Sequence, residues 1–481
     1  MANIRPSLRE ARSKIVATVG PACSDIDTLA ELVTKGVDVF RINTAHGKIE
    51  DFEQVLANIK EVRARTGFPV AILLDLAGPK IRLGQLQQDP MDVEVGDELE
   101  FVREGQVENA KQLTSSHATL IDEIQVDDSI MLADGTISLR VVEKQHDKCR
   151  CVVHTAGTIR SRQGINLPGV SLSVTAMLPI DVENAMWGAK NDIDFISLSF
   201  VRSPQDVNSL KDLLGSLGSK ALVIAKIEKR EALECLDEVV QAADGIMVAR
   251  GDLGVEIDVA RTPVEQKRII DCCRKHLKPV IVATQMLESM HQNTRPTRAE
   301  ASDVANAILD GADACMLSGE TAIGQYPSAA VETMDRIMTH TEQMLKDRPS
   351  DEIAKVFDKV HPITSAVTYS AASVAQTIGS KLVVVVSRTG GTAWVKSKQR
   401  NFIPTLGVSN NHATLRRMCL FWGIMPHYFE NVDHTQALYD HITSWGENRG
   451  MLQQGDSVVF VTGTGIIDNT HNQVVVHEIR K

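Results

Sequence analysis

The sequence is poor in aromatic residues, and it lacks paired cysteines and long apolar runs. Only 4% of its 481 residues are aromatic, so a large core must be built mainly from Val, Ile, Leu, Ala and Met. The eight cysteines are scattered and form no Cys-x-x-Cys pair, which favours reduced thiols in a cytoplasmic protein. No apolar run approaches about twenty residues, so we expect no membrane span.

Positive charge is also in short supply. The net charge is -11 and the pI is near 5.7, which argues against a general nucleic-acid or anionic-membrane binder. The polar, basic start carries no apolar stretch typical of a secretory signal, so we expect a cytoplasmic location. The hydrophobic content of 43% is ordinary for a globular protein, and the length predicts two or three domains.

What the sequence does contain is a repeated strand–helix alternation. It occupies the first 84 residues, breaks, and resumes after residue 178. Eight such units predict a closed (β/α)8 TIM barrel, with a doubly wound open sheet as the alternative. The expected strands are 15–20, 37–47, 71–84, 195–200, 222–227, 245–250, 280–285 and 314–319.

The break in this alternation predicts an inserted domain. Short alternating segments with Asp-Gly and Pro-Gly turns favour a small β-barrel or sandwich, and a second α/β pattern follows the barrel. The α/β chain is therefore expected to comprise an N-terminal arm (1–13), a barrel (14–84 and 179–349), a β-rich insert (85–178) and a C-terminal α/β domain (350–481).

Polar residues follow the expected barrel strands, where barrel enzymes place their active sites. Any one of them could form a structural ion pair, but charges at six strand ends would converge on one small volume. Together with Phe200, which follows Ser199, these residues are Arg41, Asn43, His46, Asp75, Lys80, Arg82, Ser199, Lys226, Glu228, Asp252, Thr284, Ser318 and Glu320.

Three of these side chains predict metal-assisted chemistry. Lys226 and Glu228 are two residues apart and share one face of their strand, and Asp252 comes from the next strand, roughly 5 Å away. Two carboxylates suit Mg²⁺ together with substrate oxygens. Lys226 could neutralise a transferring phosphoryl group or form a Schiff base.

Other strand-end residues suit an anionic substrate. Arg41 can grip a phosphate or carboxylate, and Gly251 allows the backbone to approach a ligand. We expect a helix to start after Asp252 and to offer N–H donors to an anion. Thr284 is either a hydrogen-bonding or proton-relaying hydroxyl of the site, or a satisfied core hydroxyl.

Several segments carry a family resemblance. They are AKIE (225–228), ARGDLGVE (249–256), ATQMLESM (283–290), the long run 295–327 and QGINLPG (163–169). The chain resembles pyruvate kinase from about residue 12 onward. The resemblance implies a barrel, a mobile β-rich lid, a C-terminal effector domain and a homotetramer. It also implies phosphoryl transfer from phosphoenolpyruvate to ADP, giving pyruvate and ATP, with Mg²⁺ or alternatively Mn²⁺.

The resemblance assigns roles by motif position. Lys226 would stabilise the transferring phosphoryl group, Glu228 and Asp252 would bind the metal, and Arg41 would hold the phosphate. Ser318 and Glu320 would supply a proton to the enolate. The phosphoenolpyruvate site would include Ser199, Phe200, Gly251, Asp252 and Thr284, and the nucleotide side Asn43, Thr44, Ala45, His46, Arg82 and Gln163.

Two motifs depart from the family pattern. Residues 43–47 read NTAHG where the family commonly has N-F-S-H-G, and residues 75–80 read DLAGPK instead of D-T-K-G-P-E. Ala45 and Leu76 lack the side-chain oxygens that bind K⁺, while Lys80 supplies a fixed positive charge. The chain thus resembles the potassium-independent branch. Gln163 stands where many members have a lid lysine, which weakens one expected nucleotide contact.

A glycine-rich turn follows the expected strand 382–387. Its hydroxyls and amides, from Ser387, Thr389, Gly390, Gly391 and Thr392, can cradle a phosphate. The turn resembles the family's effector loop, so we expect a phosphorylated effector of unknown identity. An ordinary strand-to-helix turn is the alternative reading.

Two other functions remain open from the sequence. A metal-dependent pyruvate-enolate lyase or aldolase would use the same carboxylates, and a Schiff-base aldolase would use Lys226. A catalytically inactive sensor of phosphorylated metabolites is the third reading, although the retained Lys226, Glu228, Asp252 and Thr284 argue against it.

Overall fold

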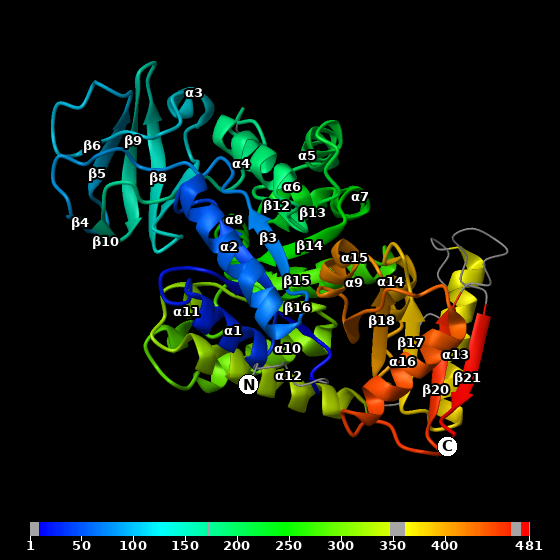
Figure 1. Cartoon of the computed structure of the whole chain (residues 1–481). Coiled ribbons are helices and arrows are strands. Elements are labelled where there is room, and N and C mark those ends of the chain that lie inside the picture. The colour runs from blue at the N-terminus through cyan, green and yellow to red at the C-terminus, as the bar shows by residue number, and fades with distance from the viewer. Residues whose placement is uncertain (1–8, 171–172, 347–360, 463–472, 481) are drawn as a thin grey trace.

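The computed structural model describes residues 9–170, 173–346, 361–462 and 473–480. Most of the expected arm and the expected 349/350 boundary lie outside these residues. The described chain forms a central barrel with an all-β insert on one side and a C-terminal α/β domain on the other (Figure 1).

The barrel is closed by eight parallel strands, as predicted, and the open-sheet alternative is wrong. The strands pair around the barrel in the order β1-β16-β15-β14-β13-β12-β3-β2, and each is buried along almost its whole length. They are β1 Lys14–Thr18, β2 Val37–Asn43, β3 Ala71–Asp75, β12 Phe195–Leu198, β13 Leu222–Ile227, β14 Gly245–Ala249, β15 Val280–Ala283 and β16 Ala314–Leu317.

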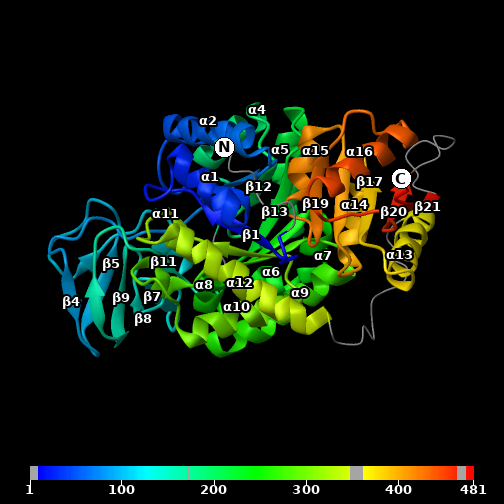
Figure 2. The ribbon, with the colours of Figure 1, turned by 60° about the horizontal axis from the view of Figure 1, so that its bottom comes forward.

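Amphipathic helices surround the strands and bury their apolar faces against them. Figure 2 shows this ring from a second direction. Asp25 caps the first helix and Gly36 ends it, while Thr297 and Glu300 form a capping box on another. The helices are α1 Ile26–Lys35, α2 Ile49–Thr66, α4 Pro179–Lys190, α5 Pro204–Ser216, α6 Arg230–Glu234, α7 Leu236–Ala242, α8 Arg250–Glu256, α9 Thr262–Lys275, α10 Arg298–Asp310, α11 Gly319–Ala322 and α12 Pro327–Lys346, with 3₁₀ turns Val259–Arg261 and Glu288–His291.

Two barrel segments differ from the sequence prediction. One expected strand–helix unit, after β13, contains two helices at residues 230–242 where one was expected, because the backbone at Cys235 leaves the helical region. The polar, glycine-rich segment after β14 is the helix α8, which begins at Arg250. Asp252 therefore lies inside the first turn of a helix and not before it.

The described residues of the insert are all-β apart from one short helix, α3 Leu120–Glu123. A curled six-stranded sheet in the order β11-β7-β8-β9-β5-β6 and a two-stranded sheet, β10-β4, enclose their own apolar core. The strands are β4 Met91–Val93, β5 Glu98–Val102, β6 Gln112–Leu113, β7 Ser129–Leu132, β8 Ile137–Lys144, β9 Lys148–Thr155, β10 Gly157–Ile159 and β11 Ile165–Asn166.

The C-terminal domain is a five-stranded sheet, β19-β18-β17-β20-β21, which is parallel except for β21. Helices pack on the two faces of this sheet, and separate apolar clusters fill the space beneath them. The elements are α13 Pro362–Thr377, β17 Leu382–Val386, α14 Gly391–Lys398, β18 Thr405–Ser409, α15 His412–Met418, β19 Ile424–Tyr428, α16 Thr435–Glu447, β20 Ser457–Thr462 and β21 Gln473–Glu478.

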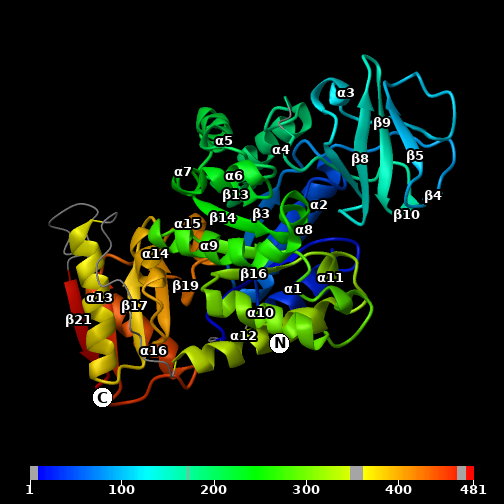
Figure 3. The same cartoon turned by 180° about the vertical axis from the view of Figure 1, so that it is seen from behind.

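This domain docks on the end of the barrel where the strands begin. Lys14 Nζ, at the start of β1, donates to the Ile424 carbonyl at 2.8 Å, and Arg416 pairs with the buried Asp194 just before β12. Cys419 and Leu420 join the apolar cluster inside the barrel. These contacts of the described residues thus lie at the opposite end from the one where the strands finish. The view from behind shows the same arrangement (Figure 3).

Candidate active site

The ends of β3, β12 and β13 bring three side chains around one largely buried ammonium, that of Lys226. Lys226 Nζ lies 2.9 Å from Glu228 Oε1 and 3.4 Å from Asp75 Oδ1. It also donates to Ser199 Oγ at 2.8 Å. Since Asp75 and Glu228 are 1% exposed, both carboxylates are held inside the protein by this cation. The sequence prediction that Lys226 and Glu228 share one face is confirmed.

The charged groups of this cluster stabilise one another's ionised forms. Burial disfavours the charged form of Lys226, but the carboxylates of Asp75 and Glu228 outweigh it and raise the pKa of Lys226. Burial likewise opposes ionisation of Asp75, yet Lys226 and Arg41 together hold the pKa of Asp75 below its ordinary value. Lys226 is therefore a permanent cation and Asp75 a permanent anion near neutral pH.

Arg41 enters the same network from β2. Its Nε donates to Asp75 Oδ2 at 2.7 Å, and a second nitrogen lies 2.6 Å from the same oxygen. A third nitrogen donates to Thr18 Oγ1, at the end of β1, at 3.0 Å. These contacts orient the guanidinium at the strand ends, and its side chain remains 11% exposed.

Asp252 lies at the edge of the cluster and keeps 26% of its side chain exposed. Burial is the main cause that raises the pKa of Glu228; Lys226 opposes it, and the charge of Asp252 adds to it. Lys80 Nζ lies 3.8 Å from Asp252 Oδ1 and 3.5 Å from Asp134 Oδ1, in the turn between β7 and β8. Glu228 and Asp252 are thus acidic groups that repel each other, and Lys80 contacts Asp252 at its exposed side.

Strained backbone supports the substrate-side residues. Thr284 has φ 70° and Phe200 has φ 54°, values in the left-handed region that non-glycine residues rarely adopt. The Gly251 amide donates to Thr284 Oγ1 at 2.8 Å, and the Phe200 amide donates to Glu228 Oε2 at 2.6 Å. The Gly251 amide thus has a protein partner.

Glu320 and Ser318 lie at the end of β16. Glu320 is fully buried and accepts the amides of Leu287 at 3.1 Å and Ser318 at 2.8 Å. Within the described chain, neither Ser318 Oγ nor His291 Nε2 has a hydrogen-bond partner, and His291 Nε2 lies 3.9 Å from Glu320 Oε2. This corner therefore holds polar groups suited to passing a proton.

The residues expected on the nucleotide side lie in three different surroundings. Thr44 is buried, donates to the Asp75 carbonyl at 3.0 Å and accepts the Ala77 amide at 3.1 Å, so its hydroxyl shapes the loop. Ala45 and His46 are exposed beside Asn43, whose side chain accepts the Ala45 amide. Arg82 and Gln163 lie at the junction with the insert, where Arg82 pairs with Gly164 in an isolated bridge.

The expected effector loop joins β17 to α14. Ser387 Oγ accepts the Gly390 amide at 3.1 Å, and Gly390 has φ 94°, a conformation that favours glycine. Ser387 and Thr392 are buried, while Thr389 and Gly391 are exposed. Only part of the expected set therefore faces solvent.

Some contributors and some contacts escape prediction. Asp75 is expected among the strand-end residues, but its contacts with both Lys226 and Arg41 appear only in the fold. Thr18 and Asp134 reach the site from β1 and from the insert, and no local pattern marks them. His291 lies in a 3₁₀ turn that was not predicted.

Comparisons with known proteins give a consistent result. The family model described as pyruvate kinase, barrel domain, matches residues 10–331, and that of the pyruvate kinase alpha/beta domain matches residues 365–477. A pyruvate kinase of Geobacillus stearothermophilus is 39% identical over 97% of this chain and 80% of its own length. One of Thermotoga maritima is 36% identical over 97% of this chain and 99% of its own length.

A solved structure agrees. The crystal structure of a pyruvate kinase from Cryptosporidium parvum covers 98% of this chain and 96% of its own, with a TM-score of 0.89 and 31% sequence identity. Among the described residues, no helix combines the length and apolar character needed to cross a membrane. With both family models matched in order and relatives aligned over almost its whole length, the chain belongs to the pyruvate kinase family.

Proposed function

We propose that this chain transfers the phosphoryl group of phosphoenolpyruvate to ADP at the carboxyl ends of the barrel strands. The observation that carries the proposal is the buried ammonium of Lys226, held by Asp75, Ser199 and Glu228 beside the partly exposed Asp252. Phosphoryl transfer needs charge stabilisation and positioning more than covalent chemistry, and a fixed cation provides the first.

The donors fit a hard divalent cation. Glu228 and Asp252 are neighbouring carboxylates whose mutual repulsion helps to raise the pKa of Glu228, and a divalent ion would offset it. We propose these two as the ligands of Mg²⁺, with Mn²⁺ as an alternative. When bound, the ion would supply charge neutralisation and help to orient the phosphoryl oxygens.

Side chains of the chain would bind the substrate and supply the proton. Lys226 would face the transferring phosphoryl group, and Arg41, held by Asp75 and Thr18, would hold the substrate phosphate. Phe200, Gly251 and Thr284 would shape the pocket for the carboxylate end. Protonation of the enolate would draw on the polar corner at Ser318 and Glu320, where the Ser318 hydroxyl keeps its hydrogen-bonding capacity.

The nucleotide would lie against the exposed residues at the end of β2 and the junction with the insert. Asn43, Ala45 and His46 offer the first surface, and Arg82 the second. We propose that the insert acts as a lid over ADP, because Asp134 of the insert contacts Lys80 of the barrel. Gln163 carries no charge, so it would contribute less than a lysine to holding the nucleotide phosphates.

We also propose that K⁺ is not required. Leu76 is fully buried, Ala45 lacks a polar side chain, and Lys80 places its ammonium 3.8 Å from Asp252. A cation is therefore built into the site. The C-terminal loop 387–392 would bind a phosphorylated effector. We propose that the chain forms a homotetramer. The proposed domain boundaries lie at residues 84, 178 and 349.

The permanent charge of Lys226 weighs against the Schiff-base alternative. An amine must be neutral to attack a carbonyl, whereas Asp75 and Glu228 raise the pKa of Lys226. Borohydride trapping with pyruvate should therefore leave the chain unlabelled. The intact cluster likewise weighs against an inactive sensor.

A coupled lactate dehydrogenase assay tests the proposal. With phosphoenolpyruvate, ADP and Mg²⁺, we expect pyruvate formation that depends strictly on ADP and persists when K⁺ is replaced by a bulky inert cation at equal ionic strength. Pyruvate release without ADP would instead indicate hydrolysis of phosphoenolpyruvate and would contradict phosphoryl transfer to ADP. No turnover by the folded chain would support the sensor reading, and collapse without K⁺ would refute potassium independence alone.

A further inference from the structure

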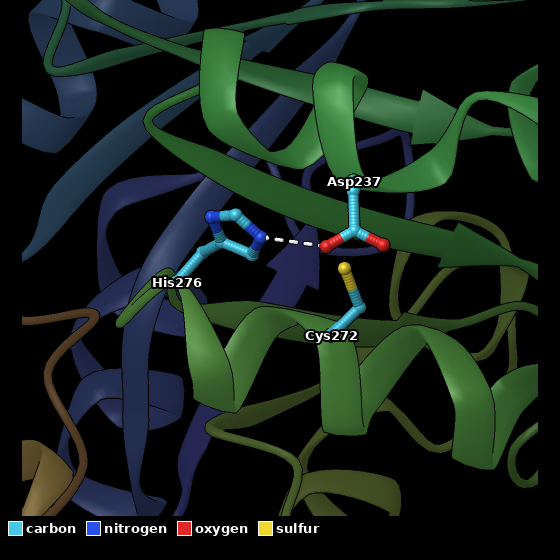
Figure 4. A group of neighbouring side chains, drawn as sticks. All are labelled: Asp237, Cys272 and His276. Atoms are coloured by element: carbon cyan, nitrogen blue, oxygen red, sulfur yellow. Dashed lines mark hydrogen bonds and ion pairs between the residues drawn. The ribbon is translucent and has the colours of Figure 1, made fainter.

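A second cluster of ligand-type side chains lies on the outside of the barrel, between α7 and α9. Asp237 is in the first turn of α7, Cys272 is in α9, and His276 directly follows α9. One potential ligand atom from each lies within 4.8 Å of the others. Because Cys272 and His276 are four residues apart, they project from the same side of the helix (Figure 4).

The geometry is close to that of a bound ion. His276 Nε2 lies 2.8 Å from Asp237 Oδ1, and the Cys272 thiol points toward the same carboxylate (Figure 4). In a tetrahedral zinc site, metal–ligand lengths of about 2.0–2.3 Å put the ligand atoms about 3.3–3.7 Å apart. The oxygen and nitrogen would separate by about half an ångström, and Asp237 can allow this because its side chain is 73% exposed.

The donor types indicate which ion fits. A purely structural hydrogen bond between the two helices would explain why Asp237 and His276 lie together. It would not explain why the thiol of Cys272 lies beside both of them. Sulfur, nitrogen and oxygen donors together suit Zn²⁺ and similar transition-metal ions, whereas Mg²⁺ and Ca²⁺ prefer oxygen alone. The exposed side of Asp237 leaves room for water as a fourth ligand.

We propose that Asp237, Cys272 and His276 form a binding site for Zn²⁺ or a similar divalent transition-metal ion, separate from the active site. On binding, the Cys272 S–H bond gives way to a metal–thiolate bond, and the proton is released to solvent. The Asp237–His276 hydrogen bond, in which Nε2–H donates to the carboxylate, is replaced by two metal–ligand bonds, and the neutral imidazole then carries its proton on Nδ1. No redox change is involved.

The site would act as a clamp next to the C-terminal domain. Directly after His276, the Leu277 carbonyl accepts the Trp394 indole N–H, and the Lys278 carbonyl accepts Lys398 Nζ at 2.8 Å. Both donors belong to α14. An ion that ties α7 to α9 therefore stabilises the segment on which the C-terminal domain rests, and the thermal midpoint should rise when it binds.

Co²⁺ is a direct probe, because a cobalt–thiolate bond absorbs in the near ultraviolet. The full-length chain would be titrated with Co²⁺ in excess Mg²⁺, which occupies the active-site carboxylates. We expect about one Co²⁺ per chain with this absorption, displaced by Zn²⁺. Cys272→Ser and His276→Gln should each abolish the band, and Asp237→Asn should weaken binding by about tenfold.

Matched controls separate this site from other thiols and imidazoles. Cys235→Ser alters a half-buried thiol outside the cluster, and His340→Gln alters an exposed histidine on α12; both should keep the band. Absence of the band in the wild-type chain, or its persistence in Cys272→Ser, would overturn the proposal. If Cys272→Ser fails to fold, Asp237→Asn still decides, because unchanged affinity in that exposed position would also refute the site.

Discussion

The ammonium of Lys80 lies 3.8 Å from a carboxylate oxygen of Asp252 and 3.5 Å from one of Asp134. Asp252 belongs to the barrel end, and Asp134 belongs to the insert. One lysine therefore contacts acidic groups on both sides of the junction, at the point where the family resemblance places a monovalent cation. Its charge is covalently attached and does not depend on the salt composition.

Replacing this lysine should create a need for a monovalent cation. We expect Lys80→Glu to lower turnover in the absence of K⁺ by about 10²-fold, because a fixed positive charge is replaced by a negative one beside Asp252. Added K⁺ should restore part of the loss. The measurement is the coupled assay with and without K⁺.

Lys60→Glu makes the same charge change at an exposed position of α2 and serves as the control. If Lys80→Glu turned over at the wild-type rate without K⁺, Lys80 would have no role as a cation substitute.

Removal of the central ammonium should damage both rate and stability. Lys226→Met leaves Asp75 and Glu228 buried without their shared partner, so we expect unfolding to become easier by about 3–5 kcal/mol. The kcat should fall by about 10²–10³-fold, since charge on the transferring group loses its stabiliser. Steady-state kinetics and thermal unfolding measure the two effects.

A lysine in a more exposed ion pair provides the comparison. Lys211 pairs with Asp244 at 2.7 Å and is 32% exposed, so Lys211→Met should cost no more than about 1 kcal/mol and leave kcat unchanged. Equal stability losses in the two variants would contradict the importance assigned to the buried cluster.

Lys396 provides a test of pH dependence. Burial, and after it the charge of Arg12, lower the pKa of Lys396 to about 7. The folded state then binds fewer protons than the unfolded state between pH 7 and the ordinary value of about 10.5. The destabilisation caused by Lys396 is complete below pH 7 and fades as the pH rises toward 10.5.

Lys396→Met should therefore raise the thermal midpoint by several degrees at pH 6.5 and by less at pH 9.5. Lys381→Met, at an exposed position of the same domain, is the control, and its effect should be small at both values. An equal gain at both pH values would mean that folding does not lower the pKa of Lys396.

The effector loop offers a charge test. Thr389 is exposed between the buried Ser387 and Gly390, so Thr389→Glu adds a negative charge where a phosphate would bind. With a panel of sugar phosphates as probes, we expect the activating concentration to rise by at least about tenfold. Gln376→Glu, on the exposed face of α13, is the control, and an unchanged response in Thr389→Glu would exclude the loop as the effector site.

The sequence predicted the closed barrel because eight evenly spaced strand–helix units, each with a short apolar strand that ends in polar residues, match the eight units of a (β/α)8 fold. It predicted that Lys226 and Glu228 meet, since residues two apart share a face of a strand. It could not predict that Arg250 starts a helix, because Gly251 and Gly254 disfavour one and the surrounding fold overrides that preference. The approach of Asp134 depends on how the insert folds, which no local pattern encodes.

The left-handed backbone at Thr284 and Phe200 has a consequence for how this enzyme can change. Glycine would relieve the conformational cost at both positions, of order 1–3 kcal/mol each. It would also remove the hydroxyl that accepts the Gly251 amide and the ring packed beside Gly78. Directed evolution for heat tolerance alone should therefore tend to accept glycine at these positions and yield proteins with higher thermal stability and lower turnover. Such a campaign needs selection for turnover at every round.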